Sequence, residues 1–182
     1  MSPDSSPPSG MTPDELRQWL VDNEIDEVEA IVPDMAGVAR GKYMPAKKFS
    51  AERVMRLPES VFIQSVTGEY IDDWLDDRTV NPADRDMETR PDLTTLRVVP
   101  WGEEPTACVI HDCFEPDGSP VDIAPREVLR RIVALYHGLG LVPVVAPEIE
   151  FYLVKRNTDP DYPLEPPIGR SGRKETIRQP YS

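Results

Sequence analysis

Apolar side chains recur every three or four residues in two stretches of the chain, which is the spacing of an amphipathic helix. The first stretch follows Thr12, Pro13 and Glu15. A threonine cap, a proline at the first helical position and a glutamate three residues after the cap mark a helix start, so we expect a helix over residues 13–23. A second helix is expected over residues 125–137, and its apolar face consists of Val128, Leu129, Ile132, Val133, Leu135 and Tyr136.

Shorter apolar runs lie between turn-forming residues, which is typical of β-strands. Strands are expected over residues 28–33, 38–44, 61–67, 93–101, 107–114 and 144–153, with a short helix over 51–57. Hairpins combined with a few helices indicate an α+β fold. We expect a disordered leader over residues 1–11, a first domain over 12–118 and the beginning of a second domain over 119–182. The last strand has no later partner, so the chain resembles the first part of a longer polypeptide.

The run at residues 144–153 contains two carboxylates, Glu148 and Glu150, among apolar residues. Side chains two apart on a strand point to the same face. Adjacent carboxylates repel each other, and their burial is unfavourable unless a cation compensates. Hard divalent cations such as Mg²⁺ and Mn²⁺ take such oxygen ligands. The pattern therefore indicates either a metal site on a strand or the solvated face of an ordinary alternating strand.

Bulk composition excludes several classes of protein. The 182-residue chain has a formal net charge of −13, and phosphate contacts need a basic surface, so no nucleic-acid partner is expected. No stretch approaches the roughly 20 apolar residues of a membrane span, and residues 1–11 lack the features of a secretory signal. Cys108 and Cys113 are too few for a disulfide framework, so we expect a cytoplasmic protein with reduced thiols.

Acidic residues concentrate between positions 69 and 92. Such a patch is most often a feature that favours solubility. An acidic surface also raises the local concentration of a cationic substrate. Composition alone leaves both interpretations open.

Three motifs resemble a known family when they are taken in order. The segment Asp-Met-Ala-Gly-Val-Ala-Arg-Gly-Lys at 34–42 resembles the hairpin near the start of glutamine synthetase-like ligases. The segments at 86–92 and 96–101 resemble a later part of that family's N-terminal domain. Pro-Glu-Ile-Glu-Phe at 147–151 resembles the strand that opens its catalytic domain. On these motifs the chain is identified as a member of the glutamine synthetase superfamily, from residue 13 to residue 182.

The resemblance implies an N-terminal β-grasp domain followed by the beginning of an α/β catalytic domain. It also implies a ring-shaped homo-oligomer, typically a dodecamer, with active sites between neighbouring subunits. The implied reaction uses ATP to phosphorylate the γ-carboxylate of glutamate before ammonia or an amine attacks it, with Mg²⁺ or Mn²⁺ bound. By position, Glu150 matches a ligand of the first cation and Glu148 a ligand of the second. We interpret Arg40 and Lys42 as solvated or interface charges rather than as a phosphate grip.

The chain departs from the family pattern at residues 62–69, where an Asp-Gly-Ser-Ser motif is expected and its ammonium-binding aspartate is missing. This departure resembles the branch that uses amines, the γ-glutamylpolyamine and γ-glutamylputrescine synthetases. In that context the acidic stretch becomes a candidate receptor for a flexible, multiply charged amine, with Tyr70 and Trp74 available for cation–π contacts. Its candidate substrate-binding residues are Glu69, Asp72, Asp73, Asp76 and Asp77.

The resemblance leaves two alternatives to a glutamate–amine ligase. One is a true glutamine synthetase with an altered ammonium site, and the other is a non-catalytic relative that serves as a sensor or binding module. By the resemblance, the remaining metal ligands and the ATP-binding and glutamate-binding residues of the family are expected beyond residue 182. We therefore expect the chain by itself to be inactive.

Overall fold

The computed structural model describes residues 10–71, 73, 79–159 and 161–176. The chain divides into two compact units, residues 1–142 and residues 143–182, and each is described by itself. Most of the expected leader, residues 1–9, lies outside the described residues, while Met11 is buried in the core of the first unit.

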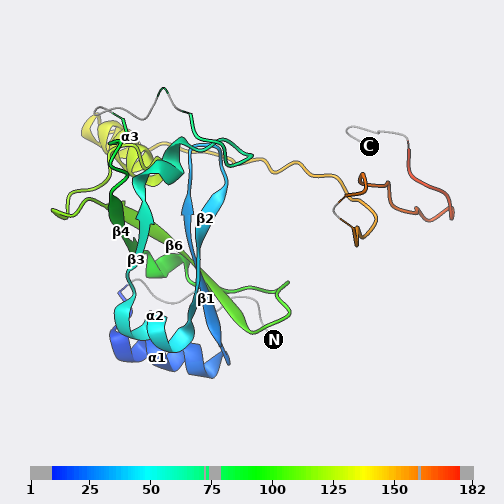
Figure 1. The fold of residues 1–182 in the computed structure, drawn as a ribbon, viewed down its shortest axis with the longest axis horizontal. Helices are drawn as coiled ribbons and strands as arrows, with labels where there is room; N and C mark the ends of the chain where they lie inside the picture. The colour runs from blue at the N-terminus through cyan, green and yellow to red at the C-terminus, as the bar shows by residue number, and fades with distance from the viewer. Residues whose placement is uncertain (1–9, 72, 74–78, 160, 177–182) are drawn as a thin grey trace. The chain divides into compact units, whose positions relative to one another are not determined.

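A mixed sheet forms the centre of the first unit. Its described strands are β1 (Glu27–Pro33), β2 (Ala39–Pro45), β3 (Met55–Pro58), β4 (Asp86–Pro91), β5 (Arg97–Val98) and β6 (Thr106–Phe114). They run in the order β2-β1-β6-β4-β3, and β5 pairs with β6. The β1–β6 pair is parallel, and the other pairs are antiparallel. Figure 1 shows β1 and β6 side by side in the middle of the sheet.

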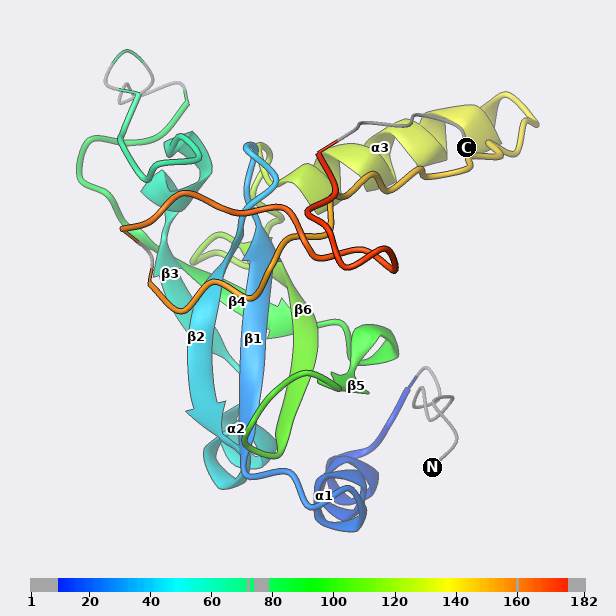
Figure 2. The same ribbon diagram turned by 90° about the vertical axis from the view of Figure 1, so that its right-hand side faces the viewer.

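Helices cover the two ends of this sheet. The helical segments among the described residues are α1 (Pro13–Asp22), α2 (Ala46–Glu52), α3 (Pro125–Gly138) and the 3-10 turns η1 (Glu59–Ile63) and η3 (Leu93–Thr95). Figures 1 and 2 show α1 and α2 at one end of the sheet and α3 at the other. None of the described helices is long and apolar enough to span a membrane.

The capping box predicted for the first helix is confirmed. The Thr12 N–H donates to a carboxylate oxygen of Glu15 at 2.7 Å, and the Glu15 N–H donates to Oγ1 of Thr12 at 3.2 Å. These two bonds satisfy backbone donors that a helix start leaves without partners. Leu16 and Leu20 of α1 then enter the core beside Phe49 of α2.

Alternation along the strands places the core on one face of the sheet. In β1, Val28, Ala30 and Val32 are buried, whereas the residues between them are partly exposed. In β6 the buried set includes Ala107 and Val109. The sheet with its helices agrees with the expected α+β class.

Several expected elements differ from those observed. The strand expected over 61–67 is replaced by η1 and a turn. The helix expected over 51–57 is observed earlier in the chain as α2, which ends at Glu52, and residues 55–57 belong to β3. The strand expected over 93–101 is divided into η3 and β5. Arg53, with a left-handed φ of 54°, ends α2 before β3, and the Asp92 carboxylate accepts from the Thr94 N–H at the start of η3.

The strand expected over residues 144–153 is also absent. Residues 141–157 have no regular secondary structure, and Ile149, Phe151 and Tyr152 are exposed. A strand is stabilised by the ladder of hydrogen bonds to its neighbours, because an isolated extended segment leaves its backbone groups to water. Among the described residues no other segment forms such a ladder with this run.

The second unit is held by a few local contacts. An isolated bridge pairs Ile168 with Lys174. The Glu165 carboxylate lies 3.1 Å from the Lys174 ammonium and 3.7 Å from the Lys155 ammonium. Among its described residues there is no helix or strand ladder.

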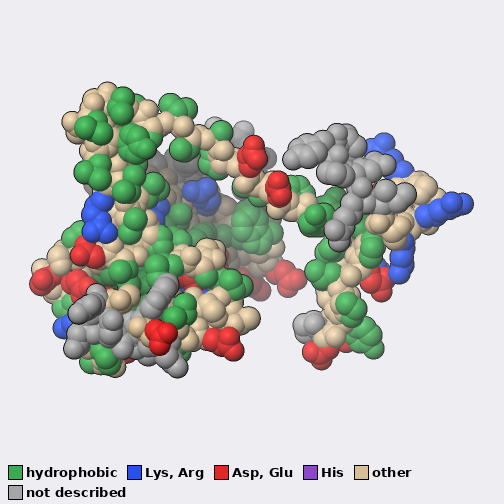
Figure 3. All heavy atoms as spheres, turned by 90° about the horizontal axis from the view of Figure 1, so that it is seen from above, with side chains coloured by type: hydrophobic (Ala, Val, Ile, Leu, Met, Phe, Trp, Pro, Cys, Tyr) green, Lys and Arg blue, Asp and Glu red, His purple; other side chains and the backbone are tan. Residues whose placement is uncertain are grey.

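Helix α3 of the first unit has an exposed apolar face. Leu129 and Leu135 are 62% and 66% exposed, and no residue of the helix is buried. Figure 3 shows the hydrophobic side chains gathered over this helix. The amphipathic pattern therefore predicted the helix correctly, but this face has no cover within the first unit.

Candidate functional site

A tight turn at residues 64–71 occupies the place where the family motif is missing. The Ser65 N–H donates to the carbonyl of Glu69 at 2.8 Å, and the Gly68 N–H donates to the carbonyl of Ser65 at 3.0 Å. Gly68 has a φ of 85°, a left-handed conformation that glycine adopts without strain. The departure from the family motif thus falls on an ordered turn.

Side chains within the turn fix the carboxylate of Glu69. The Glu69 N–H donates to Oγ of Ser65 at 3.1 Å. The hydroxyl groups of Ser65 and Thr67 lie 2.9 Å apart, and the Thr67 hydroxyl donates to a carboxylate oxygen of Glu69 at 3.2 Å. Glu69 is exposed. The turn therefore presents a negative charge to solvent in a defined position.

An ion pair in the β1–β2 hairpin supports this turn. The carboxylate of Asp34 is fully buried and accepts from the N–H groups of Ala36 at 2.9 Å and Val38 at 2.8 Å. Its second oxygen accepts from Nε of Arg40 at 2.7 Å. The same guanidinium donates through Nη2 to the carbonyl of Ser65 at 3.0 Å. Arg40 thus joins the hairpin to the turn that carries the exposed carboxylate.

The structure contradicts the interpretation of Arg40 as a solvated charge, and its interpretation as an interface charge stays a prediction. Its side chain is only 20% exposed, and it has two acceptors within the chain. Lys42 fits the interpretation better, because it is exposed, although its ammonium donates to the carbonyl of Arg56 at 2.9 Å. Neither residue adjoins a phosphate-binding loop among the described residues.

The acidic residues predicted to receive an amine are described only in part. Glu69 and Asp73 are both exposed, and Tyr70 is 49% exposed. Asp72, Asp76 and Asp77 lie outside the described residues, as does Trp74. The structure therefore fixes the first residue of the acidic stretch, and the binding role of the others stays a prediction.

The two predicted metal ligands belong to the second unit. Glu148 and Glu150 are exposed and lie in a segment without regular structure, so the expected arrangement on one face of a strand is not formed. Among the described residues, no group of three or more histidine, cysteine, aspartate or glutamate side chains comes together in a metal-binding arrangement. The two carboxylates have the donor chemistry of a Mg²⁺ or Mn²⁺ site, but they supply only part of the six or more oxygens that such ions take.

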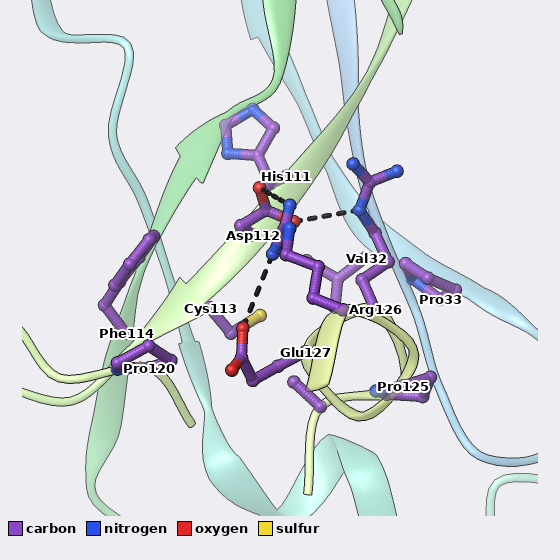
Figure 4. Close-up of a pocket in the computed structure, with 12 residues that line it drawn as sticks. Val32, Pro33, His111, Asp112, Cys113, Phe114, Pro120, Pro125, Arg126 and Glu127 are labelled. Atoms are coloured by element: carbon purple, nitrogen blue, oxygen red, sulfur yellow. Dashed lines mark hydrogen bonds and ion pairs between the residues drawn. The ribbon is translucent and has the colours of Figure 1, made fainter. Parts of the chain in front are cut away.

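A small cavity lies between α3 and the end of β6 (Figure 4). Its volume of about 10 Å³ is room for one water molecule at most. His111 and Cys113 line it from the strand. Burial lowers the pKa of His111 to about 4, although Thr89 and Asp112 oppose this. Burial and then the charge of Asp112 raise the pKa of Cys113 to about 12. A neutral imidazole and a protonated thiol in so small a space do not form a nucleophilic site.

Ion pairs around this cavity attach α3 to the sheet. Arg126 donates to Asp92 at 2.5 Å and to Asp112 at 2.8 Å, and Arg130 also donates to Asp112. Figure 4 shows Arg126 and Asp112 directed toward each other across the space between helix and strand. Burial raises the pKa of Asp92, but hydrogen bonds from Thr94 and Arg126 outweigh this effect, and the pKa is lowered overall. The cluster is a structural junction.

The contacts of Arg40 with Asp34 and Ser65 are a feature of the candidate site that the sequence did not predict. The available signal was an aspartate and an arginine on either side of a glycine-containing turn, which is a common arrangement for an ion pair across a hairpin. The second acceptor, the carbonyl of Ser65, is 25 positions away along the chain. No local pattern predicts that contact.

Comparisons with known proteins point to one family. The catalytic-domain family of glutamine synthetase matches residues 122–182. A gamma-glutamylethanolamide synthetase of Streptomyces coelicolor is 35% identical over 159 residues, which cover 85% of this chain and 33% of that protein. A gamma-glutamylputrescine synthetase of Escherichia coli is 31% identical over 157 residues, with the same two coverages of 85% and 33%.

A glutamine synthetase of Mycolicibacterium smegmatis is also similar, with 41% identity over 85 residues. That match covers 44% of this chain and 19% of the relative. The chain spans about a third of the length of the gamma-glutamylethanolamide and gamma-glutamylputrescine synthetases.

Proposed function

This chain belongs to the glutamine synthetase superfamily over the segment that it spans, and we propose that the protein is an ATP-dependent ligase that joins the γ-carboxylate of glutamate to an amine. The observation that carries the proposal is the similarity to two synthetases of γ-glutamyl amides across 85% of the chain. The turn at residues 64–71 supports it, because an exposed, fixed carboxylate suits a cationic acceptor.

In the proposed reaction, the γ-carboxylate of glutamate takes the γ-phosphoryl group of ATP, and ADP leaves. The nitrogen of the amine then attacks the acyl phosphate, inorganic phosphate leaves, and the amide forms. The amine is protonated at neutral pH, so one nitrogen must lose a proton before it attacks. The role of Glu69 and the acidic stretch in this scheme is to attract the acceptor and hold its positive charge. This role suits a polyamine or a related amine.

The part of the first unit over residues 12–118 has the place of the β-grasp domain in this proposal. Its mixed sheet with α1 and α2 at one end is consistent with that assignment. The family match begins at residue 122, close to the proposed boundary between residues 118 and 119. We further propose a cytoplasmic homo-oligomer, a dodecamer by the family resemblance, in which the turn at residues 64–71 faces the catalytic domain of a neighbouring subunit.

Glu148 and Glu150 are the proposed ligands for Mg²⁺ or Mn²⁺. When bound, such ions neutralise charge that builds on the transferred phosphoryl group. Because these two residues provide only some of the ligands, others must come from elsewhere in the complete protein. The segment that contains them would then become ordered around the ions.

The test is phosphate release from ATP by the full-length protein, with glutamate and Mg²⁺ fixed and the acceptor varied among ammonium, putrescine, spermidine and ethanolamine. We expect turnover with an amine at a far lower concentration than with ammonium. A preference for ammonium would instead identify a glutamine synthetase. The similar protein from Mycolicibacterium smegmatis is named for that function. Absence of turnover with every acceptor would favour a non-catalytic binding protein.

A further inference from the structure

We propose that Arg40 is a positioning residue that holds the turn at residues 64–71 so that Glu69 presents its carboxylate to the amine acceptor. The proposal rests on the proposed amine-ligase function. It assigns to the β1–β2 hairpin a part in amine affinity, although the hairpin itself contains no candidate substrate ligand.

The first step of the argument is the anchoring of Arg40. Its Nε atom lies 2.7 Å from a carboxylate oxygen of Asp34 whose side chain has no exposure to solvent. The other oxygen of Asp34 accepts two backbone N–H groups of the hairpin turn. A buried carboxylate is stable only with its partners in place. The guanidinium therefore has a fixed position relative to β1 and β2.

The second step is the contact of this fixed guanidinium with the turn. Nη2 of Arg40 donates to the carbonyl of Ser65 at 3.0 Å. Ser65 is also the residue that organises the turn, since its N–H donates to the Glu69 carbonyl and its hydroxyl accepts from the Glu69 N–H. A fixed Ser65 thus restrains the backbone of Glu69, four residues away, and the Thr67 hydroxyl, 2.9 Å from that of Ser65, donates to the Glu69 carboxylate.

The third step concerns the identity of the residue. A planar guanidinium offers several donors in one rigid group and can reach two acceptors in different directions at once. A lysine at position 40 offers one ammonium on a flexible stem. It can retain the ion pair with Asp34, but it cannot span Asp34 and Ser65 in the same geometry. The contact with both Asp34 and Ser65 therefore requires arginine, whereas the ion pair with Asp34 requires only a cation.

The fourth step links position to affinity. A carboxylate that is already oriented binds a cation with a smaller loss of conformational entropy than a mobile one. Release of the turn should therefore raise the KM for the amine. It should leave the kcat at saturating amine nearly unchanged, because Arg40 touches no reacting atom.

The experiment compares full-length Arg40→Lys and Arg40→Gln variants with the unmodified protein. Hydrogen exchange is measured by mass spectrometry for the amides of residues 63–71, and the KM and kcat are measured for the amine that gives turnover. Lys42→Gln is the matched control, because Lys42 lies on the same strand and donates to Arg56, away from the turn. The melting temperature of each variant separates local release from general unfolding.

We expect both Arg40 variants to exchange faster at residues 63–71, with Arg40→Lys near the melting temperature of the unmodified protein. The KM for the amine should rise about tenfold, which corresponds to about 1.4 kcal/mol of lost binding free energy, and the kcat should stay within about twofold. The control should change neither quantity.

Unchanged exchange at residues 63–71 in Arg40→Lys overturns the positioning role, whatever the kinetics. Faster exchange with an unchanged KM for the amine shows that the turn is held by Arg40 but does not bind the acceptor, and this also overturns the proposal. If the unmodified protein has no amine-dependent turnover, the proposed function fails by itself, and the exchange data still decide whether Arg40 holds the turn.

Discussion

The Nδ1 atom of His111 lies 2.9 Å from Oγ1 of Thr89, so a buried polar pair connects β6 with β4 inside an apolar core. His111 is 1% exposed, and its ring lies 6.3 Å from the ring of Phe49, centroid to centroid. Its Nε2 atom has no hydrogen-bond partner among the described residues. An imidazole in this environment is stable in its neutral form, because burial disfavours the charge.

The first prediction is that His111 makes stability fall in mild acid. The ordinary pKa of 6.5 applies to the unfolded chain, and burial lowers the pKa in the fold to about 4. Between these values the unfolded chain binds more protons, so the stability present above pH 6.5 is lost as the pH falls toward 4. At about 1.4 kcal/mol for each pKa unit, the loss at pH 4 is on the order of 3 kcal/mol.

Urea unfolding at several pH values measures this effect. His111→Gln should show a smaller decrease in the free energy of unfolding between pH 6.5 and 4 than the unmodified protein. His137→Gln is the control, since His137 is exposed near the end of α3. Equal pH dependence in all three proteins would contradict the prediction.

The second prediction concerns the attachment of α3 to the sheet. Asp112 accepts from both Arg126 and Arg130, and its side chain is only 16% exposed. Asp112→Asn removes the charge from both pairs, so we expect the free energy of unfolding to fall by about 1–3 kcal/mol.

Asp122 offers a matched control for this change. It pairs with Arg131, which lies on α3 like Arg126 and Arg130, but the Asp122 side chain is 85% exposed. Exposed pairs contribute little, so Asp122→Asn should change stability by less than about 1 kcal/mol. Thermal unfolding followed by circular dichroism compares the two variants. An equal change in stability in both variants would show that the partial burial of Asp112 does not strengthen its ion pairs.

Local signals predicted α1 and the β1–β2 hairpin well. The capping box needs only Thr12 and Glu15, which are three residues apart, and the hairpin needs only a turn between two apolar runs. Such short-range interactions are complete within the segment that contains them. The sequence of such a segment therefore contains all the interactions that determine its local structure.

Signals that depend on distant partners were less informative. The pattern of residues 144–153 is suitable for a strand, but a strand also requires neighbouring backbone, and the described residues provide none. The apolar face of α3 was predicted correctly from its spacing, whereas the pattern contained no information about what covers it. The apolar pattern of a strand or helix shows which of its faces is suited to burial. It does not show which other segment packs against that face.

The candidate site follows the same rule. Glu69 became a candidate because the expected family motif is missing at that place, which is a comparison within a short segment, and its binding role stays a prediction. The partial burial of Arg40 was not predicted, because one of its contacts is the carbonyl of Ser65, a backbone group that every residue possesses. No residue type marks such an acceptor, and only the fold brings it within reach.

The third prediction tests the acidic stretch as a receptor for cations. Asp72→Asn combined with Asp73→Asn should raise the KM for a polyamine by about threefold or more at low ionic strength, because two attractive charges are lost. The difference in KM between the double variant and the unmodified protein should shrink in about 0.5 M salt, where the Debye length is only a few Å.

Glu103→Gln combined with Glu104→Gln is the control, since both residues are exposed and the loss of charge is the same. Initial rates of phosphate release over a range of polyamine concentrations give each KM. If the two double variants have the same KM at each salt concentration, the stretch is a solvated loop whose charge serves solubility.

The fourth prediction is that Glu148 and Glu150 bind the divalent cation in the full-length protein. Replacing either carboxylate by an amide removes a charged oxygen ligand of a hard cation. Glu150→Gln and Glu148→Gln should therefore each weaken binding of Mn²⁺ by at least about tenfold.

Glu165→Gln is the control, because Glu165 lies in the same unit and pairs with Lys155 and Lys174. Electron paramagnetic resonance of free Mn²⁺ measures binding directly, independent of turnover. Equal Mn²⁺ affinity in the three variants and the unmodified protein would show that these glutamates are ordinary exposed residues, and the ligands of any cation would then have to lie elsewhere in the protein.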